Sequence, residues 1–217
     1  MNRRKIVCLD LDQTLISFIP SFLKVNNVFF GVEITEDEYS EHWGETRWKS
    51  RYSDEEWEKK NGREWAKHVV EIGLYRDLPA MPGAKEALMK LAGLEARLMV
   101  LTSRRIEFME DTKFCLAKLF PEIEFERLFV TGAYDGHEVS SARHAITKGA
   151  MAAELGVSVL VDDQPKHALS AVECGVSAIL FGRDAEAMGV DADEKRGLYR
   201  AMDWSEATSI LERILMT

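Results

Sequence analysis

Asp10 and Asp12 are the first residues of this sequence that point to chemistry. They follow a short apolar run, Ile6 to Leu9, which is typical of a strand buried on both faces of a sheet. Such a strand has no structural use for two carboxylates at its end. Side chains alternate along a strand, so both carboxylates would point the same way, where they either raise one another's pKa or need a cation. This spacing favours a divalent metal site over the alternative, in which one aspartate caps a turn and the other is solvated.

A second acidic pair, Asp162 and Asp163, follows the apolar run Val157 to Val161 in the same way. Pro165 comes next and suits the first turn of a helix. Adjacent carboxylates at a strand end require positive charge nearby, so the second pair supports the interpretation of the first. Turn capping explains Asp163 better than Asp162. Oxygen ligands without a cysteine or histidine partner fit magnesium better than zinc.

The rest of the chain predicts the elements that position these pairs. Further strands are expected over residues 97–101, 127–130 and 176–181. Helices are expected over 84–93, from Ile106 to Leu119, over 149–155, and from Asp203 onward. This alternation predicts an α/β fold with a mostly parallel, Rossmann-like sheet and helices on both of its faces. Ligands bind beyond the carboxyl ends of such strands, where both acidic pairs and Thr102 fall.

Residues 17–80 interrupt this alternation. The stretch is rich in charge and tryptophan, and capping boxes beginning at Thr35 and Ser53 predict two helices. Trp65, Val69 and Ile72 recur at helical spacing and give the second helical region an apolar stripe. Two prolines and a glycine near residue 80 then end the stretch. We predict a helical insert over 17–80 and a main domain formed by residues 1–16 and 81–217.

Four stretches resemble the motifs of the haloacid dehalogenase-like (HAD) phosphatases, in the order of that family. Asp10-Leu11-Asp12-Gln13-Thr14-Leu15 resembles motif I, DxDx[TV]. Arg97 to Ser103 resembles motif II, Lys148 has the place of motif III, and Val157 to Asp163 resembles motif IV. In this family an insert after motif I is a C1 cap, a lid over the strand ends. The junction Leu78 to Gly83 resembles the 5'(3')-deoxyribonucleotidase branch, but Gln13 stands where many members carry glycine.

The resemblance implies a Mg²⁺-dependent phosphomonoester hydrolase that acts through an aspartyl-phosphate. It makes Asp10 the nucleophile and Asp12 the general acid and base. The phosphate-binding residues would be Thr102, Ser103 and Lys148, with His144 and Arg143 as the alternatives to Lys148. The metal-binding residues would be Asp10, Asp12 through its backbone carbonyl, Asp162 and Asp163. Arg104 would either lie at the mouth of the site or begin the next helix.

The composition limits the kinds of partner that are expected for this protein. Acidic residues outnumber basic ones, 37 to 28, for a formal net charge of -9, and no long block of Lys or Arg is present, which argues against duplex nucleic acid. Asp10 and Asp12 interrupt any apolar signal segment, and no stretch approaches membrane-spanning length, so no membrane partner and a cytoplasmic location are expected. The three cysteines Cys8, Cys115 and Cys174 suit reduced core thiols.

Three functional classes remain open at this point. The first is a phosphatase, with a small phosphorylated metabolite as its substrate. The second is a phosphotransferase such as a mutase, and a sugar-phosphate phosphatase is a related alternative. The third is a HAD-fold protein without catalysis, against which the intact acids of every motif speak. A nucleoside monophosphate is the first choice of substrate, because insert aromatics such as Trp43 and Trp48 could stack on a base. The alternative is that these aromatics form the insert's own core.

Overall fold

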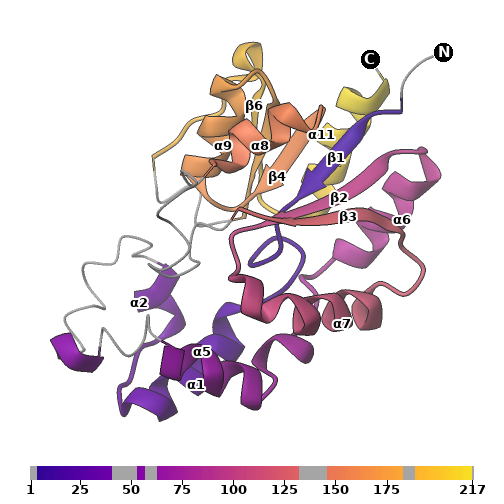
Figure 1. Cartoon of the computed structure of the whole chain (residues 1–217). Helices are drawn as coiled ribbons and strands as arrows, with labels where there is room; N and C mark the ends of the chain where they lie inside the picture. Colours follow the sequence, from indigo (N-terminus) through magenta and orange to yellow (C-terminus); the bar gives the residue numbers. More distant parts are fainter. Residues whose placement is uncertain (1–3, 41–52, 57–62, 132–145, 183–188, 217) are drawn as a thin grey trace.

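A parallel sheet forms the centre of the protein. The computed structural model describes residues 4–40, 53–56, 63–131, 146–182 and 189–216. The six strands have the order β3-β2-β1-β4-β5-β6, and all neighbours run parallel (Figure 1). Their bounds are Ile6–Leu9 (β1), Arg97–Thr102 (β2), Phe125–Val130 (β3), Val159–Asp162 (β4), Ser177–Phe181 (β5) and Leu198–Ala201 (β6). This confirms the predicted α/β, Rossmann-like fold.

Helices cover both faces of the sheet because alternate strand residues point to opposite sides. Val7, Leu9 and Val100 belong to a cluster with α6 (Ala84–Gly93), α7 (Met109–Leu119) and α11 (Trp204–Met216). Ile6, Cys8 and Leu101 belong to a second cluster with α8 (Lys148–Glu154) and α9 (Pro165–Glu173). The predicted helices therefore exist and enclose a sheet that is buried on both sides.

Two details of the main domain differ from the expectation. Strand β6 was not predicted, because only its first and last residues are buried and its four residues form no apolar run. Ile106 was expected on the buried stripe of its helix, but it is 55% exposed. The segment begins with the 3-10 turn η2 (Ile106–Phe108), which rotates Phe108 inward in its place.

The insert contains more helix than the sequence predicted. Its described elements are α1 (Ile19–Phe30), α2 (Glu36–Ser40), α5 (Arg63–Glu71) and the 3-10 turn η1 (Leu74–Arg76). Both capping boxes are present, since Thr35 and Glu38, and likewise Ser53 and Glu56, bond each other's backbone N–H. Helix α1 was missed, and Ile72 lies 46% exposed beyond the end of α5.

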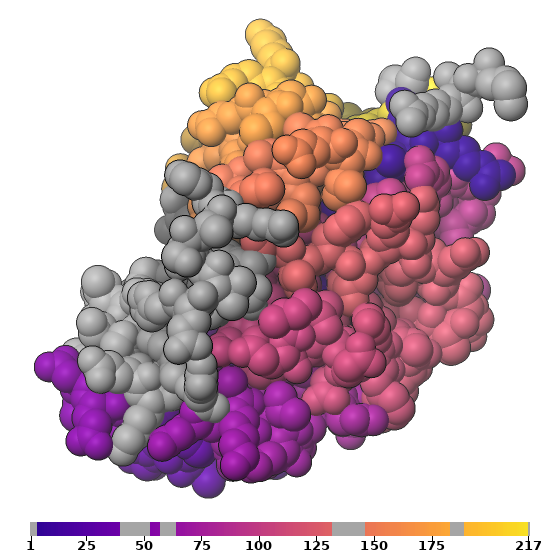
Figure 2. Space-filling view, in the orientation of Figure 1, coloured from indigo at the N-terminus to yellow at the C-terminus, as the bar shows by residue number. Residues whose placement is uncertain are grey.

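The described aromatic side chains of the insert pack against one another. Phe22 lies 5.4 Å from Tyr39 and 6.0 Å from Trp65 between ring centroids, and all three are buried. They belong to the same cluster as the α6 and α7 side of the sheet, so the insert shares its core with the main domain. In the space-filling view the described segments of the insert lie in the lower part of the molecule (Figure 2). Trp43, Trp48 and Trp57 lie outside the described residues.

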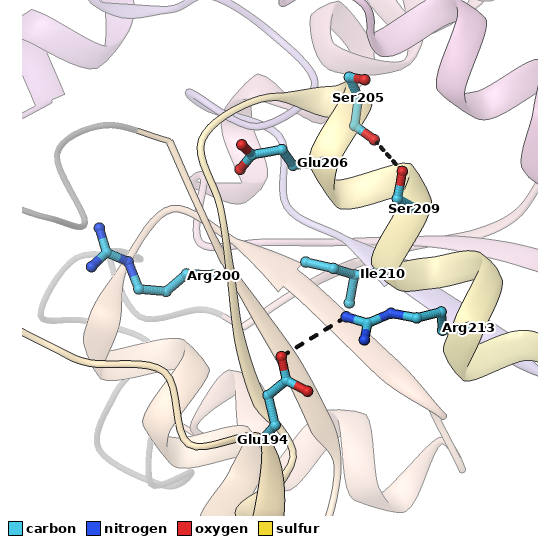
Figure 3. A pocket seen from close by; sticks show the side chains of 7 residues that line it. All are labelled: Glu194, Arg200, Ser205, Glu206, Ser209, Ile210 and Arg213. Atoms are coloured by element: carbon cyan, nitrogen blue, oxygen red, sulfur yellow. Dashed lines mark hydrogen bonds and ion pairs between the residues drawn. The ribbon is translucent and has the colours of Figure 1, made fainter.

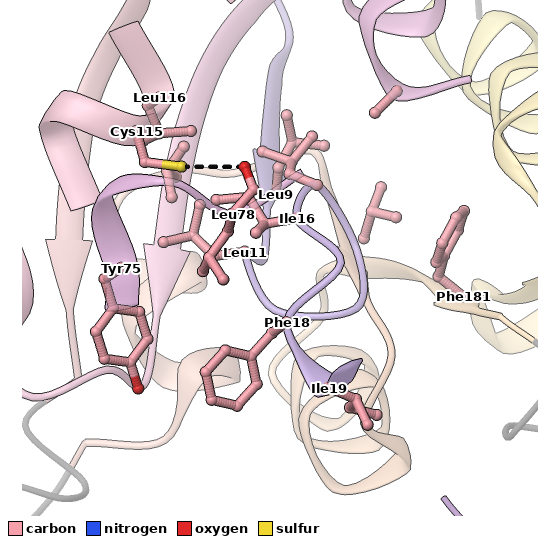
Figure 4. Packing of buried hydrophobic residues seen from close by; sticks show 14 of the residues in the cluster. Leu9, Leu11, Ile16, Phe18, Ile19, Tyr75, Leu78, Cys115, Leu116 and Phe181 are labelled. Atoms are coloured by element: carbon pink, nitrogen blue, oxygen red, sulfur yellow. Dashed lines mark hydrogen bonds between the residues drawn. The ribbon is translucent and has the colours of Figure 1, made fainter. Parts of the chain in front are cut away.

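The chain enters and leaves the insert along two adjacent segments. The Ser17 backbone N–H donates to the Pro79 carbonyl at 2.9 Å, and the Met81 N–H donates to the Leu15 carbonyl at 2.9 Å. Ile16 and Ala80 thus form an antiparallel bridge. Ile16 and Leu78 pack beside Leu11 above the end of β1, as Figure 4 shows.

The cysteines are all free, but they do not share one environment. Cys8 and Cys115 are buried, and the Cys115 thiol lies 3.6 Å from the Leu78 carbonyl (Figure 4). Cys174 is exposed at the end of α9, so the expectation of a core thiol was wrong there. Among the described helices, none has the length and apolar character needed to cross a membrane.

Candidate active site

Three neighbouring strands bring predicted site residues to one edge of the sheet. Asp10 follows β1, Thr102 ends β2 and Asp162 ends β4. Strand β1 pairs with β2 on one side and β4 on the other, and the Asp10 N–H donates to the Val161 carbonyl at 2.9 Å. The order of the strands reverses here, which is where open α/β sheets bind ligands at their carboxyl ends.

Lys148 contacts one aspartate from each of the two acidic pairs. Its Nζ lies 2.7 Å from Asp10 Oδ1 and 2.7 Å from Asp162 Oδ2, and its side chain is 1% exposed. Asp163 completes the group, since carboxylate oxygens of Asp10, Asp162 and Asp163 all lie within 4.8 Å of one another. We call these four residues the Lys148 centre.

Gly149 allows Lys148 to reach this position. A Cβ atom at residue 149 would lie 2.3 Å from the backbone of Ser170 in α9. Only glycine permits this close approach of α8 to α9. Thr147 caps α8 through its Oγ1, which accepts from the Ala150 N–H at 3.1 Å. The first residue of the helix, Lys148, therefore points into the sheet edge.

The Lys148 centre carries more negative than positive charge when all its groups are ionised. Burial raises the pKa of Asp10 to about 6, against the opposing effect of the Lys148 ammonium. Burial, together with Asp162 and Asp10, raises the pKa of Asp163 well above its usual range. Burial and the Lys148 ammonium lower the pKa of His167 to about 3, so that imidazole adds no positive charge. An all-oxygen group with excess negative charge fits a hard divalent cation such as Mg²⁺.

The Asp12 side chain forms an ion pair with Arg104. Arg104 Nε donates to Asp12 Oδ2 at 2.9 Å, and Arg104 Nη2 donates to Asp12 Oδ1 at 2.6 Å. The sequence suggested that Arg104 lies at the mouth of the site or begins the next helix. Instead, its side chain is only 2% exposed, and the next helical segment, η2, begins at Ile106. We call Arg104 and Asp12 the Arg104 pair. If Asp12 binds a metal, its backbone carbonyl is the free ligand, because its carboxylate is occupied.

The predicted phosphate-binding hydroxyls lie where β2 ends, at the same edge of the sheet. Thr102 is buried, and its Oγ1 accepts from the Arg104 N–H at 3.1 Å while its own proton remains available to donate. Ser103 is half-buried and lies 3.4 Å from the Thr131 hydroxyl at the end of β3. The alternatives to Lys148, Arg143 and His144, lie outside the described residues.

Gln13 adopts a backbone conformation that favours glycine. Its φ of 57° lies in the left-handed region, which is more costly for a residue with a side chain than for glycine. In return, its Oε1 accepts from the backbone N–H groups of Phe18 at 2.8 Å and Ile19 at 3.1 Å. The side chain thereby satisfies N–H groups at the start of α1 and ties motif I to the insert.

Sequence reasoning missed several residues that support the site. They are Tyr75 and Thr112, which contact Arg104; Gly149, which places Lys148; and Trp204, whose Nε1 donates to the Thr14 carbonyl at 2.8 Å. Only Gly149 carried a readable signal, since a glycine in the first turn of a short helix indicates a close backbone approach.

A surface pocket of about 360 Å³ lies elsewhere, between β6 and α11 (Figure 3). Its lining residues are Glu194, Arg200, Ser205, Glu206, Ser209, Ile210 and Arg213. It is three strands away from β1 and includes none of the predicted site residues.

Comparison with solved structures shows the same fold in HAD hydrolases. A haloacid dehalogenase-like hydrolase from Streptococcus pneumoniae is 14% identical, with a TM-score of 0.66 and coverage of 97% of this chain and 100% of that one. A HAD family hydrolase from Deinococcus radiodurans, with bound phosphate and sodium, is 13% identical with a TM-score of 0.60 (97% and 96% covered). The D,D-heptose 1,7-bisphosphate phosphatase of B. bronchiseptica, complexed with magnesium and phosphate, is 13% identical with a TM-score of 0.57 (96% and 98% covered).

No curated protein matches the sequence. The family model described as "5' nucleotidase, deoxy (Pyrimidine), cytosolic type C protein" matches residues 4–140, more than half of the chain. The matched segment contains motifs I and II and the whole insert. The protein is therefore a HAD-like phosphomonoesterase that belongs to the cytosolic type C 5'-nucleotidase family.

Proposed function

We propose that this phosphomonoesterase is Mg²⁺-dependent and acts through an aspartyl-phosphate on Asp10. The observation that carries the proposal is the Lys148 centre, in which a buried Asp10 shares one ammonium with Asp162 at the carboxyl edge of the sheet. Asp10, Asp162, Asp163 and the backbone carbonyl of Asp12 would hold Mg²⁺. When bound, the ion supplies positive charge that neutralises the carboxylates and the phosphoryl oxygens.

Each residue of the site has its own role in the proposed reaction. An Asp10 oxygen attacks phosphorus in line, and the bond from phosphorus to the leaving oxygen breaks as Asp12 gives that oxygen a proton. A water then attacks the aspartyl-phosphate while Asp12 accepts its proton, and the bond between Asp10 and phosphorus breaks to release phosphate. Thr102, Ser103 and Lys148 bind the phosphoryl oxygens and stabilise their charge.

The insert serves in this proposal as the C1 cap, with residues 17–80 as the lid and residues 1–16 and 81–217 as the main domain. Supporting this division, the chain crosses between the two parts through the paired segments at Ile16 and Ala80. Helix α1 starts only a few residues after Asp12 and is capped by Gln13. A lid in this place would exclude water and close around the leaving group. We also propose a cytoplasmic location, in keeping with the cytosolic type named in the family description.

A nucleoside monophosphate is the proposed substrate, ahead of a sugar phosphate. The family description names 5'-nucleotidases, and the Leu78 to Gly83 junction agrees with that branch. Sugar phosphates remain the alternative, since the structurally similar B. bronchiseptica enzyme is a heptose bisphosphate phosphatase.

Phosphate release from a panel of phosphomonoesters, with and without Mg²⁺, tests the proposal. The panel contains ribo- and deoxyribonucleoside monophosphates, sugar phosphates and p-nitrophenyl phosphate, and Asp10→Asn is the blank. We expect Mg²⁺-dependent release with nucleotides preferred. Transfer to an added sugar instead of release would identify a phosphotransferase. Release that is insensitive to Mg²⁺ would refute the metal dependence.

The tryptophans of the insert provide a test of nucleotide preference. If Trp43 or Trp48 stacks on the base, replacing it with alanine raises KM for nucleotides far more than for p-nitrophenyl phosphate, which offers the lid little to bind. Trp65→Phe is the matched control, because Trp65 is buried in the insert's core. Equal changes for both substrates would refute the nucleotidase reading while leaving the phosphatase reading intact.

A further inference from the structure

We infer that Arg104 is a positioning residue that fixes the Asp12 carboxylate as the proton donor to the leaving group. The inference rests on the proposed function and assigns a role to a residue outside the four motifs. Arg104 bonds both oxygens of Asp12, at 2.9 Å from Nε and 2.6 Å from Nη2. Two parallel bonds from a planar fork fix the rotation of the carboxylate, which one bond from an ammonium cannot do.

The two side chains of the Arg104 pair differ in their exposure to solvent. The Asp12 side chain is 23% exposed, whereas the Arg104 side chain is 2% exposed. The Arg104 guanidinium therefore contacts the carboxylate from its buried side. Asp12, which must exchange a proton in the proposed reaction, is the member of the pair that remains accessible. Each carboxylate oxygen has a second lone pair beyond the one that Arg104 occupies, so the pair leaves room for a proton and for the leaving oxygen.

Arg104 is itself held by three separate elements. Its Nη1 donates to Thr112 Oγ1 in α7 at 2.9 Å, and its backbone N–H donates to Thr102 Oγ1 at the end of β2 at 3.1 Å. Its guanidinium carbon lies 4.4 Å from the centroid of the Tyr75 ring in η1. Tyr75 is in turn packed against Phe108, with 4.5 Å between ring centroids. The guanidinium cannot follow Asp12 into another rotamer without losing its contacts with Thr112 and Tyr75.

Stability alone does not account for such a pair. Buried ion pairs are costly to desolvate, and replacing one with apolar side chains often leaves a protein as stable or makes it more stable. The same chain also offers a comparison at the opposite end of β2, where Arg97 makes a bidentate pair with Glu126. Those side chains are 33% and 37% exposed and lie far from the carboxyl edge. Arg97 is therefore a matched control for the loss of a bidentate pair.

Leaving groups of different quality report on the placement of the proton donor. As the bond from phosphorus to the leaving oxygen breaks, an alkoxide needs the Asp12 proton, whereas nitrophenolate leaves without much help. A displaced donor should therefore slow alkyl phosphates selectively, and misplacement by about 1 Å can cost roughly 100-fold in rate. A purely structural role for Arg104 would slow both substrates alike.

The test measures kcat and KM of Arg104→Met, Arg104→Lys and Arg97→Met with p-nitrophenyl phosphate and with an alkyl phosphate that the wild type hydrolyses. We expect Arg104→Met to lower kcat for the alkyl phosphate by about 100-fold and for p-nitrophenyl phosphate by less than about 10-fold, with KM little changed. Arg104→Lys should show the same selectivity with a smaller loss. Arg97→Met should leave both rates unchanged.

A double mutant decides whether Arg104 acts through Asp12. In the Asp12→Asn background, Arg104→Met should cause little further loss, because the group that it positions is already disabled. An additive loss, an equal loss for both substrates or no loss at all would overturn the inference. If Arg104→Met does not fold, as judged by circular dichroism, Arg104→Lys alone decides by its selectivity. A wild type that releases no phosphate would overturn the proposed function instead.

Discussion

Lys148 and Arg104 are both buried cations beside motif I, yet they meet their carboxylates in different ways. Lys148 places one ammonium between Asp10 and Asp162, with Asp163 close by, so its centre keeps excess negative charge. Arg104 faces one carboxylate, Asp12, and occupies both of its oxygens, so the pair is balanced. A compact ammonium can be shared between acids, whereas a planar fork fixes one acid in one orientation.

In the proposed reaction, this difference separates the task of Asp10 from that of Asp12. The unbalanced Lys148 centre suits a site that takes up further positive charge, since burial first and then the Asp162 carboxylate raise the pKa of Asp10. The Arg104 pair carries no excess charge for a metal to neutralise. In the inference above, it fixes the orientation of the Asp12 carboxylate. If this division holds, variants on the two sides should change different measurements.

The largest effect is expected at the nucleophile. Asp10→Asn should lower kcat by at least about 1000-fold, because the amide cannot form the aspartyl-phosphate but keeps the shape of the side chain. Phosphate release is the measurement, and circular dichroism confirms the fold. Retention of a tenth of the wild-type rate would remove Asp10 from this role.

On the Arg104 side, Asp12→Asn should lower kcat for alkyl phosphates by about 100-fold or more, within the range of general acid catalysis. The loss should be smaller for p-nitrophenyl phosphate, and the Mg²⁺ concentration needed for half-maximal rate should not change. Similar losses for both substrates would argue against Asp12 as the acid.

On the Lys148 side, Asp162→Ala should raise the Mg²⁺ concentration for half-maximal rate by at least about 10-fold, because one oxygen ligand is lost. High Mg²⁺ should then recover part of the rate. Arg104→Met is the control and should leave this concentration unaltered. An unchanged Mg²⁺ dependence in Asp162→Ala would move the metal elsewhere.

The unbalanced charge also predicts a pH dependence of metal stabilisation. Burial raises the pKa of Asp10 to about 6, so the folded metal-free protein binds this proton more tightly than the unfolded chain. Stability should therefore fall as pH rises between about 4 and 6. Mg²⁺ binds the ionised acid, so the increase in Tm that it causes should be larger at about pH 7.5 than at about pH 5. Equal increases at both pH values, measured by scanning fluorimetry, would contradict the charge argument.

The smallest effect is expected at Gln13, which follows Asp12 and contacts the start of α1. Gln13→Ala should lower the free energy of unfolding by about 1 kcal/mol, because the start of α1 loses its side-chain acceptor while the left-handed backbone remains. Gln13→Gly should cost less, since glycine adopts this φ freely. Urea unfolding measures both. A larger loss for the glycine variant would contradict the argument from the left-handed backbone, and no loss for the alanine variant would show that the cap is not what Gln13 contributes.

The strands and acids of this site were predictable because their signals are local. Apolar runs ending in acidic pairs mark β1 and β4, and the order of the motifs was sufficient to select Lys148, which the structure brings between Asp10 and Asp162. The role of Arg104 was not predictable, because it depends on Asp12, 92 residues away, and on the Tyr75 ring.

Helix α1 and strand β6 were missed for different physical reasons. Asn26 and Asn27 in the middle of α1 are poor helix formers, but Asn27 bonds the backbone of Ile34 through both its side-chain amide and its carbonyl oxygen. That contact lies outside the helix, where no periodicity records it. Strand β6 is held by its pairing with β5, and its two middle residues are half-buried. Tertiary contacts, and not local preference, fix both elements.

The hydrogen bond from Trp204 to the Thr14 carbonyl has a consequence for folding during synthesis on the ribosome. It joins residues 190 positions apart, and Trp204 is 1% exposed. The loop that carries Asp10, Asp12 and Thr14 is synthesised long before Trp204, because synthesis runs from the N-terminus to the C-terminus. Asp162, too, emerges long after Asp10. The nascent chain therefore carries this loop without the Trp204 support until α11 has been made, so we expect activity to appear only after α11 has docked.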